Sequence, residues 1–288
     1  MRKLVCCLLM GCFLLSAAVV WGQWGTGSFS NDPFGALNNA FNKLGGQVNL
    51  EEDYYLGRAV AANILSMPNY RLYTANPGLT NYLNRICQTL VINSSNPSIF
   101  NGYHVAILDT QEYNAFATPG GHIMLTKGLV EAAASEDALA AIIAHELAHI
   151  NLRHAAEIIE GMSLVNQAGD MADRAAALTG NSRAAQQAQA LRQSVAPIVD
   201  TMIKNGFSQA QEFDADRKAL EILDAAGYDP QALLEILQIL QRVQPNQRGG
   251  FNSTHPSPRD RIANVNSNIS GYRPNSTQSY RQPRFSNR

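Results

Sequence analysis

One stretch constrains the fold more than any other: two histidines and a glutamate lie inside a long apolar run. His145, Glu146 and His149 form the pattern H-E-x-x-H, and residues 139–144 before them read Leu-Ala-Ala-Ile-Ile-Ala, without glycine or proline. Such a run predicts an α-helix that is buried on most sides. On a helix, histidines four residues apart lie one turn apart on the same face. A buried helix with three polar groups in register needs a partner for them.

The spacing of this pattern suits a metal ion. Two imidazoles one turn apart can both reach a single Zn²⁺ at about 2.0–2.1 Å. Glu146 follows the first histidine and can take a proton from water on the open side of the metal. The pattern therefore predicts that His145 and His149 are zinc ligands and that Glu146 is a general base. The alternative, a chance match on a helical surface, is disfavoured by the apolar flanks.

A second helix offers a further ligand. Ser208, with Gln211 three residues later, is a capping-box pattern that begins a helix. Glu212 and Asp216 lie four residues apart on one face of that helix. A carboxylate on a second helix is what a gluzincin requires as its third ligand, and a second carboxylate one turn on can hydrogen-bond a ligating imidazole. The alternative, a solvated acidic face, is disfavoured because apolar residues interleave with the acids.

The other histidines are weaker candidates. His104 and His122 lie on expected strands without a partner at ligand spacing, so we expect structural roles for them. The helix of the H-E-x-x-H pattern is expected to run to about Met162. On that helix His154 would point about 140° away from His149, which disfavours it as a ligand and favours a role in packing or capping the helix.

A histidine late in the chain is a candidate for the same site. His255 lies between Thr254 and Pro256 and can fold back toward the metal. It would stabilise the tetrahedral intermediate or occupy a fourth zinc position at rest; packing at a helix start is the alternative. Arg259 is expected to pair with a helix end or with the substrate backbone.

Four motifs occur together in one order. They are Asn114-Ala115-Phe116-Ala117-Thr118-Pro119-Gly120-Gly121, His145-Glu146-Leu147-Ala148-His149, Glu212-Phe213-Asp214-Ala215-Asp216 and Ser253-Thr254-His255-Pro256. With this set the chain resembles the HtpX/BepA/Oma-like zinc metallopeptidases, relatives of the CAAX prenyl protease. The resemblance implies that Glu212 is the third zinc ligand, that Asp216 supports the ligands and that the N-A-F-A strand borders the cleft. The several membrane spans of HtpX-like members and the helical-repeat domain of BepA have no counterpart, which implies an exported form, soluble or singly anchored.

These patterns predict a mainly helical α+β fold: a zincin-like metallopeptidase domain with a small, mostly antiparallel sheet beside the zinc helix. The order strand, strand, glycine-rich turn, strand favours the antiparallel arrangement. The substrate is expected to pair with the sheet edge at Asn114, Ala115, Phe116 and Ala117. Helices are expected over 51–66, 77–92, Ser208 to Gly227 and Asp229 to Val243, and strands over 103–108, 114–118 and 122–126.

The start of the chain predicts export. A basic beginning and an apolar run make residues 1–22 a signal peptide that is removed. Two alternatives stay open: residues 4–21 retained as a membrane anchor, which would allow membrane association, and a lipoprotein site at Cys12.

The remaining chain divides by composition. Residues 23–50 predict a linker with a short docking helix, and residues 51–269 predict the zinc metallopeptidase domain. Residues 163–207, low in charge, are expected to form a helical hairpin or a mobile cover over the site. Residues 270–288, rich in Asn, Ser, Gln and Arg, predict a disordered tail.

Charge and cysteine usage exclude some partners. The formal net charge of −1 gives no basic excess, so nucleic acid is not expected as a partner. Cys87 is the one cysteine beyond the expected signal, so no intramolecular disulfide can form. We expect it to be a buried structural thiol.

The expected function is that of an exported metalloendopeptidase with one Zn²⁺ per chain, and the expected location is the periplasm. Cleavage of unfolded or misassembled envelope proteins is implied by the resemblance alone. The alternative is a zinc-stabilised, chaperone-like binding protein with little turnover. Glu146 argues against it, because structural zinc sites usually have four protein ligands and no use for a base. The oligomeric state is not indicated by the sequence.

Overall fold

The computed structural model describes residues 50–161, 199–200, 206–243, 254–255, 258–275 and 277–288. All of them belong to one compact unit, Gln47–Arg288. The expected signal peptide and docking helix, and most of the 163–207 segment, lie outside the described residues. Within the described ranges, no helix is long and apolar enough to cross a membrane.

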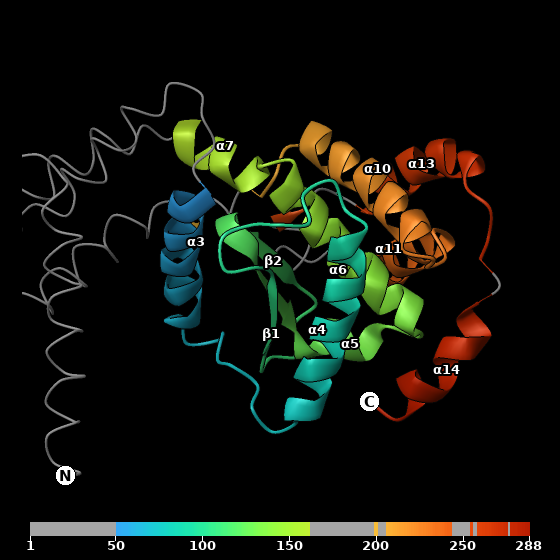
Figure 1. Ribbon diagram of the computed structural model, residues 1–288, viewed down its shortest axis with the longest axis horizontal. Helices are drawn as coiled ribbons and strands as arrows, with labels where there is room; N and C mark the ends of the chain where they lie inside the picture. The colour runs from blue at the N-terminus through green and yellow to red at the C-terminus, as the bar shows by residue number, and fades with distance from the viewer. Residues whose placement is uncertain (1–49, 162–198, 201–205, 244–253, 256–257, 276) are drawn as a thin grey trace, which may run out of the picture. The chain divides into compact units, whose positions relative to one another are not determined.

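The described chain is mainly helical with one small sheet, as the sequence predicts (Figure 1). The helices are α3 (Leu50–Leu65), α4 (Pro77–Ile92), α5 (Lys127–Ala132), α6 (Glu136–Asn151), α7 (His154–Gly161), α10 (Gln209–Ala225), α11 (Gln231–Val243), α13 (Pro258–Asn268) and α14 (Gln278–Ser286). The strands are β1 (His104–Leu108), β2 (Ala115–Thr118) and β3 (His122–Thr126), and two 3₁₀ turns are η1 (Pro119–Gly121) and η2 (Ile269–Gly271). The expected helices over 51–66 and 77–92 and the three strands are confirmed to within one residue.

The sheet is mixed rather than mostly antiparallel. Its order is β1-β3-β2, so β3 lies between the two strands that precede it in the chain. β2 and β3, joined by the Pro-Gly-Gly turn of η1, pair antiparallel, whereas β1 pairs with β3 in parallel. The expectation failed because it treated consecutive strands as neighbours, while β1 and β2 are not adjacent here. β2 is consequently an edge strand of the sheet.

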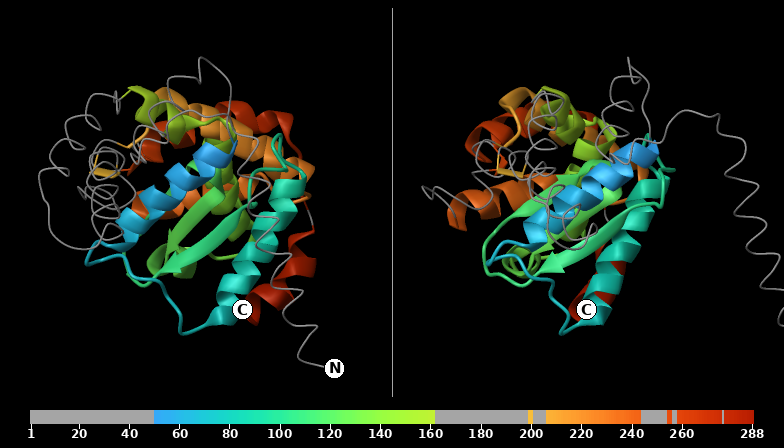
Figure 2. Two further views of the ribbon diagram at one scale, coloured as in Figure 1. Left: turned by 60° about the vertical axis from the view of Figure 1, so that its left-hand side comes forward. Right: turned by 90° about the vertical axis from the view of Figure 1, so that its left-hand side faces the viewer.

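The two faces of the sheet pack against different helices. Phe116 and Met124 form a buried cluster with Val60 of α3. Ile107 and Leu125 belong to a second, larger cluster with α4 and α6. Figures 1 and 2 show α3 on one side of the sheet and α6 on the other. The alternation of side chains along each strand thus places the sheet between two apolar layers.

α6 lies at the centre of this packing. The hydroxyl of Ser135 accepts the N–H of Ala138 at 3.0 Å, which caps the first turn of the helix. α6 packs against α4, α10, α11 and β2, and every residue from Glu136 to His149 is buried. Contacts on all sides hold the helix, and therefore the H-E-x-x-H side chains, in a fixed position.

α6 ends earlier than the sequence predicts. The expected helix to Met162 is broken: α6 ends at Asn151 and α7 begins at His154. Between them Arg153 has φ +60°, a left-handed conformation that turns the chain. Its guanidinium pairs with Asp53 of α3, which holds the turn. The break has no glycine or proline to mark it in the sequence.

The C-terminal residues include a helix, α14, in the segment for which the sequence predicts a disordered tail. α14 packs against the first turn of α6. Nε of Arg281 donates to Oδ2 of Asp137 at 3.0 Å, and Arg284 donates to Glu136. A tail with four arginines and no acid looks unable to fold by itself. Its partners lie 144 and 148 residues earlier in the chain.

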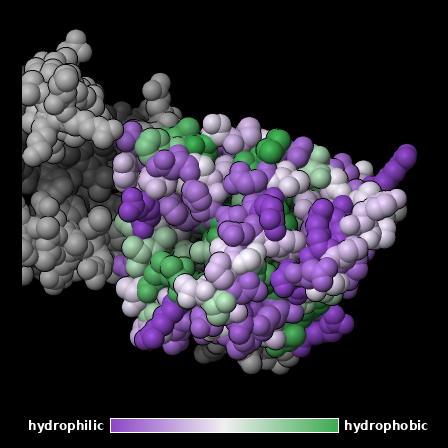
Figure 3. All heavy atoms as spheres, turned by 60° about the horizontal axis from the view of Figure 1, so that its bottom comes forward, coloured by the Kyte–Doolittle hydropathy of each residue, from purple (hydrophilic) through white to green (hydrophobic). Residues whose placement is uncertain are grey.

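One face of the described chain is shown in Figure 3. It is mostly hydrophilic, and its hydrophobic patches are small and separate. The most exposed of the large hydrophobic side chains in the described residues, Tyr280 and Ile92, lie on different helices, α14 and α4. The chemistry is therefore sought in the interior, where α6 carries its polar groups.

Candidate metal centre and active site

The two histidines of the H-E-x-x-H pattern lie together inside the domain. Their side chains extend from successive turns of α6, and Nε2 of His145 lies 3.1 Å from Nε2 of His149. They are 2% and 1% exposed. Both imidazoles thus present the same ring nitrogen to one point, as their four-residue spacing predicts.

Glu212 comes to the same point from α10. The expected capping box is present: Ser208 and Gln211 exchange hydrogen bonds at the start of the helix. Packing of α10 against α6 then brings Oε2 of Glu212 to 3.4 Å from His145 Nε2, and Oε1 to 3.4 Å from His149 Nε2. The carboxylate is fully buried. Burial raises its pKa, but the charges of His255 and Arg261 and the hydrogen bonds of both α6 histidines outweigh this and hold the pKa well below its usual value.

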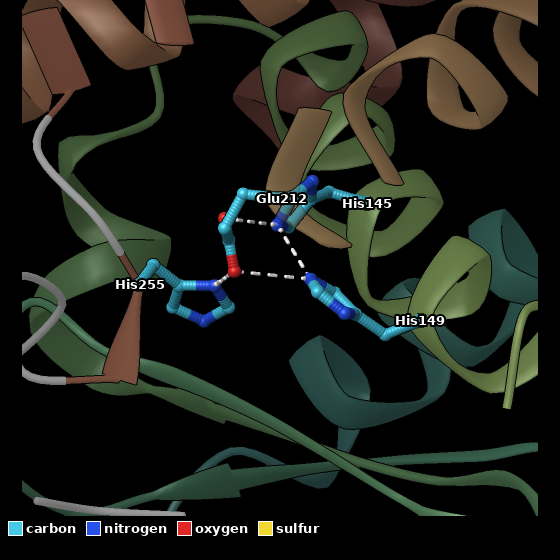
Figure 4. Close-up of side chains that lie close together, drawn as sticks. All are labelled: His145, His149, Glu212 and His255. Carbon is cyan, nitrogen blue, oxygen red and sulfur yellow. Dashed lines mark hydrogen bonds and ion pairs between the residues drawn. The ribbon is translucent and has the colours of Figure 1, made fainter. Parts of the chain in front are cut away.

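These three donors fit a metal ion. Ligands about 2.0–2.1 Å from a tetrahedral ion are about 3.3–3.4 Å from one another. The measured separations are 3.1, 3.4 and 3.4 Å. Two imidazoles and one carboxylate are also a donor set that divalent zinc accepts. Figure 4 shows the three side chains converging, with His255 on the far side of Glu212.

His255 completes a buried group of four potential ligands. One donor atom from each of His145, His149, Glu212 and His255 lies within 4.8 Å of the others. Nδ1 of His255 is 2.7 Å from Oε1 of Glu212. The histidine that the sequence placed near a proline therefore does fold back onto the α6–α10 pair.

Glu146 points into the same enclosed space. It is fully buried, and neither of its carboxylate oxygens has a hydrogen-bond partner in the described part of the chain. Nε2 of His255 lies 3.7 Å from its Oε1, beyond hydrogen-bond distance. Burial raises the pKa of Glu146, against the lowering effect of His255 and His145. A buried carboxylate without partners is costly, so this group needs water or a ligand to bond.

Asp216 and Arg261 support His145 from behind. Oδ1 of Asp216 lies 3.1 Å from Nδ1 of His145, so this carboxylate can accept a hydrogen bond from Nδ1 and hold the ring with Nε2 toward Glu212 and His149. Arg261 donates to Asp216 through Nε at 2.9 Å and through one terminal nitrogen at 2.6 Å. Its other terminal nitrogen lies 3.1 Å from Oε2 of Glu212. The guanidinium is 1% exposed and ties the two carboxylates of α10 together.

The arginine in this site is Arg261, not the expected Arg259. Arg259 is exposed on α13, and two residues on a helix point about 200° apart. Arg261 precedes Val265 and Ile269 at intervals of four, and all three are buried. An arginine that shares a four-residue spacing with two apolar residues is expected on the buried face. This is the sequence signal that would have identified Arg261.

His154 has a different position from the one expected. Because α6 is broken, its ring returns toward the site, and its Nδ1 lies 2.9 Å from Nδ1 of His149. Burial lowers the pKa of His154, which favours a neutral ring that can accept a hydrogen bond from His149. Phe207 stacks on His149 at 3.9 Å between ring centres. His154 lies outside the group of four potential ligands and contacts one of them, His149.

The strand residues expected to border the cleft lie at the sheet edge but are covered. Asn114, Ala115, Phe116 and Ala117 are at most 4% exposed. The hydroxyl of Thr254, next to His255, donates to Oδ1 of Asn114 at 2.8 Å. The segment that carries His255 thus contacts the start of β2.

Three other candidates lie apart from the site. His104 is exposed and bonds the carbonyl of Asn101 at 2.8 Å. His122 packs against Tyr54 of α3. Cys87 is buried, and burial raises the pKa of its thiol to about 12, so it is inert at neutral pH.

Comparison with known proteins gives consistent matches. Residues 77–269 match the family described as Peptidase family M48. The beta-barrel assembly-enhancing protease of Escherichia coli (strain K12) is 30% identical over 220 residues, which cover 71% of this chain and 42% of that protein. The mitochondrial metalloendopeptidase OMA1 of Schizosaccharomyces pombe is 26% identical over 221 residues, covering 76% of this chain and 61% of that protein. The chain therefore spans less than half the length of the first of these relatives.

Proposed function

Because the chain belongs to peptidase family M48, as its four motifs predict, we propose that it is a zinc-dependent endopeptidase. The observation that carries this proposal is the buried carboxylate of Glu146, which has no hydrogen-bond partner among the described residues, beside two imidazoles and a carboxylate at metal-ligand separations. His145, His149 and Glu212 would hold the ion. Bound Zn²⁺ would supply Lewis acidity, polarising a peptide carbonyl and lowering the pKa of water toward about 7.

The chain's own groups divide the remaining work. Glu146 accepts a proton from the attacking water and returns it to the leaving nitrogen when the peptide bond breaks. Its raised pKa matches this exchange, since a stronger base takes the proton more readily. Asp216 and His154 each bond the Nδ1 of one ligating imidazole and fix its orientation.

His255 has two proposed roles that share its position. It serves as a fourth ligand at rest, or it donates to the substrate oxygen as negative charge develops there. A resting ligand must leave before substrate binds, so His255→Ala would then raise the rate of hydrolysis. A donor is lost in the same variant, and the rate would fall by about 10²–10³-fold. An unchanged rate would exclude both roles.

The proposed substrate is an extended polypeptide. β2 is an edge strand beside α6, so a substrate strand could add to it and be held by main-chain hydrogen bonds. The buried state of β2 and Glu146 means that the covering residues must move first. Unfolded or misassembled envelope proteins, acted on in the periplasm, fit the predicted signal peptide and the name of the Escherichia coli relative, a beta-barrel assembly-enhancing protease.

The proposed ligand set is tested by metal content. Glu212→Gln removes one ligand charge, and we expect the zinc content of the purified chain to fall from about one per chain to a small fraction of that value. The control is Glu221→Gln on the same helix, where Glu221 pairs with Lys218 at the surface. Elemental analysis after dialysis measures both. Equal zinc content in the two variants would remove Glu212 from the site.

The alternative proposal is a zinc-stabilised, chaperone-like binding protein. Cleavage of a permanently unfolded protein, such as reduced and carboxymethylated lactalbumin, distinguishes it from a peptidase. An endopeptidase yields internal fragments that disappear with 1,10-phenanthroline and return with added Zn²⁺. A binding protein retains the substrate intact on a column and produces no fragments under either condition.

A further inference from the structure

A cavity of about 260 Å³ lies directly beside the proposed metal-binding group. His149 forms part of its wall, and Ala117 of the edge strand β2 forms another part. The rest comes from the α6–α7 junction, from α3 and from the loop that follows α4. An extended chain that pairs with β2 and reaches the metal must therefore pass this cavity.

The size and the walls of the cavity specify what fits. Pockets for whole small molecules usually measure about 300–1,000 Å³, so this one suits a single side chain. Ile99, Ala155 and Ala156 contribute apolar surface, and the two alanines on α7 leave room that larger residues would fill. The wall also contains Asp53 and Arg153, whose opposite charges pair with each other. A large apolar side chain gains most from such a space, because it is removed from water against apolar atoms.

We propose that this cavity is a specificity subsite for one substrate residue close to the scissile bond, and that it selects a large apolar side chain such as Leu, Met or Phe. The inference rests on the proposed peptidase function, since it assigns the subsite to that reaction. It adds a sequence preference to recognition that would otherwise depend on the substrate backbone alone.

Two opposite substitutions test the subsite. Ala156→Leu fills the cavity and Ile99→Ala enlarges it. Their matched controls are Ala134→Leu, at an exposed position between α5 and α6, and Ile92→Ala, at an exposed position that ends α4. The full chain with Zn²⁺ is incubated with a peptide library from a digested bacterial proteome, and the cut sites are identified by mass spectrometry.

We expect one position near the cut to be enriched in Leu, Met and Phe. Ala156→Leu should lower kcat/KM for peptides with Phe there by about tenfold or more and shift the enrichment to Ala and Val. Ile99→Ala should shift it toward Phe and Trp. Both controls should keep the wild-type profile. Cutting without such enrichment, or with enrichment that neither variant moves, overturns the subsite while leaving the peptidase function intact.

Failure of the peptidase function has a separate signature. If the wild-type chain cuts nothing, the library is instead passed over immobilised Glu146→Gln protein, alone and combined with Ala156→Leu. The subsite is supported if the Glu146→Gln protein retains peptides rich in Leu, Met and Phe and if the added Ala156→Leu substitution abolishes this retention. Retention that the added leucine leaves unchanged, or no retention, contradicts it.

Discussion

At the residue scale, Arg261 shows how a charge is kept inside this fold. Its guanidinium is 1% exposed and lies between the carboxylates of Asp216 and Glu212. Burial alone would lower the pKa of Arg261. The charges of those two carboxylates raise it by a larger amount, so the net shift is upward and the guanidinium stays protonated. Removal of one member of such a network leaves the other charges uncompensated in the interior.

Arg261→Met should therefore destabilise the chain strongly. We expect a loss of about 3–5 kcal/mol in the free energy of unfolding, because Asp216 and Glu212 lose their shared partner. The control is Arg259→Met, two residues earlier and exposed, for which we expect a change within about 0.5 kcal/mol. Urea unfolding of the metal-free chain measures both. Equal midpoints for the two variants would mean that the network contributes nothing.

Single residues also show where sequence reasoning has its limits. The positions of His145, His149, Glu212 and Asp216 follow from helical spacing, which is local. The roles of Arg261 and His154 depend on how elements turn and pack. On a continuous helix His154 would point away from His149. The left-handed Arg153 breaks that helix, and the ring of His154 returns to the site.

At the scale of elements, α3 and the η1 turn approach unusually closely. Gly120 has φ +69°, and a Cβ there would lie 2.3 Å from Cα of Tyr54. Gly227, after α10, has φ +77° but open space around it. Both positions favour glycine for their backbone conformation, and only the first also requires the absence of a side chain.

Comparison of two alanine variants separates these effects. Gly227→Ala should cost about 1–2 kcal/mol, the cost of a left-handed alanine. Gly120→Ala should cost at least about 1 kcal/mol more, because α3 must shift to relieve the overlap. Thermal unfolding at a fixed metal concentration measures the difference. If Gly120→Ala proves no worse than Gly227→Ala, the close contact of α3 with η1 is not a constraint on the fold.

A second element-scale feature is the contact of α14 with the start of α6. Burial raises the pKa of Glu136, but the hydrogen bonds from Arg284 and Tyr82 outweigh it, so the pKa lies below its usual value of 4.5. A carboxyl whose pKa is lower in the folded chain than in the unfolded chain stabilises the fold at pH values above its unfolded-state pKa. That stability is lost as pH falls through the folded pKa.

Arg284→Gln should move acid unfolding to higher pH. Without Arg284 the folded pKa of Glu136 rises, because its largest lowering interaction is lost, and the stability that it contributes disappears at higher pH in an acid titration. Arg273→Gln, at an exposed arginine before α14, is the control. Circular dichroism against pH gives the midpoints. A midpoint for Arg284→Gln that equals that of the control would show that α14 does not stabilise Glu136.

At the scale of the whole molecule, the sequence predicts what short-range patterns determine. The helices over Pro77–Ile92 and Glu136–Asn151 begin where capping residues and prolines place them. The strand order and the docking of α14 depend on contacts between distant residues. No local pattern marks Asp137 as the partner of Arg281, 144 residues later. The proposed site depends on both kinds of information. The sequence motifs of α6 and α10 are local patterns, but only the packing of the two helices brings their side chains together.

The most direct measurement compares wild type with Glu146→Gln at equal zinc content on an unfolded protein substrate. Glutamine keeps the size of the side chain but cannot accept the proton. We expect the variant to bind zinc and substrate as wild type does, while its kcat falls by about 10²–10⁴-fold. Cleavage by the variant at the wild-type rate, with zinc content matched, would show that Glu146 is not the base of a metallopeptidase.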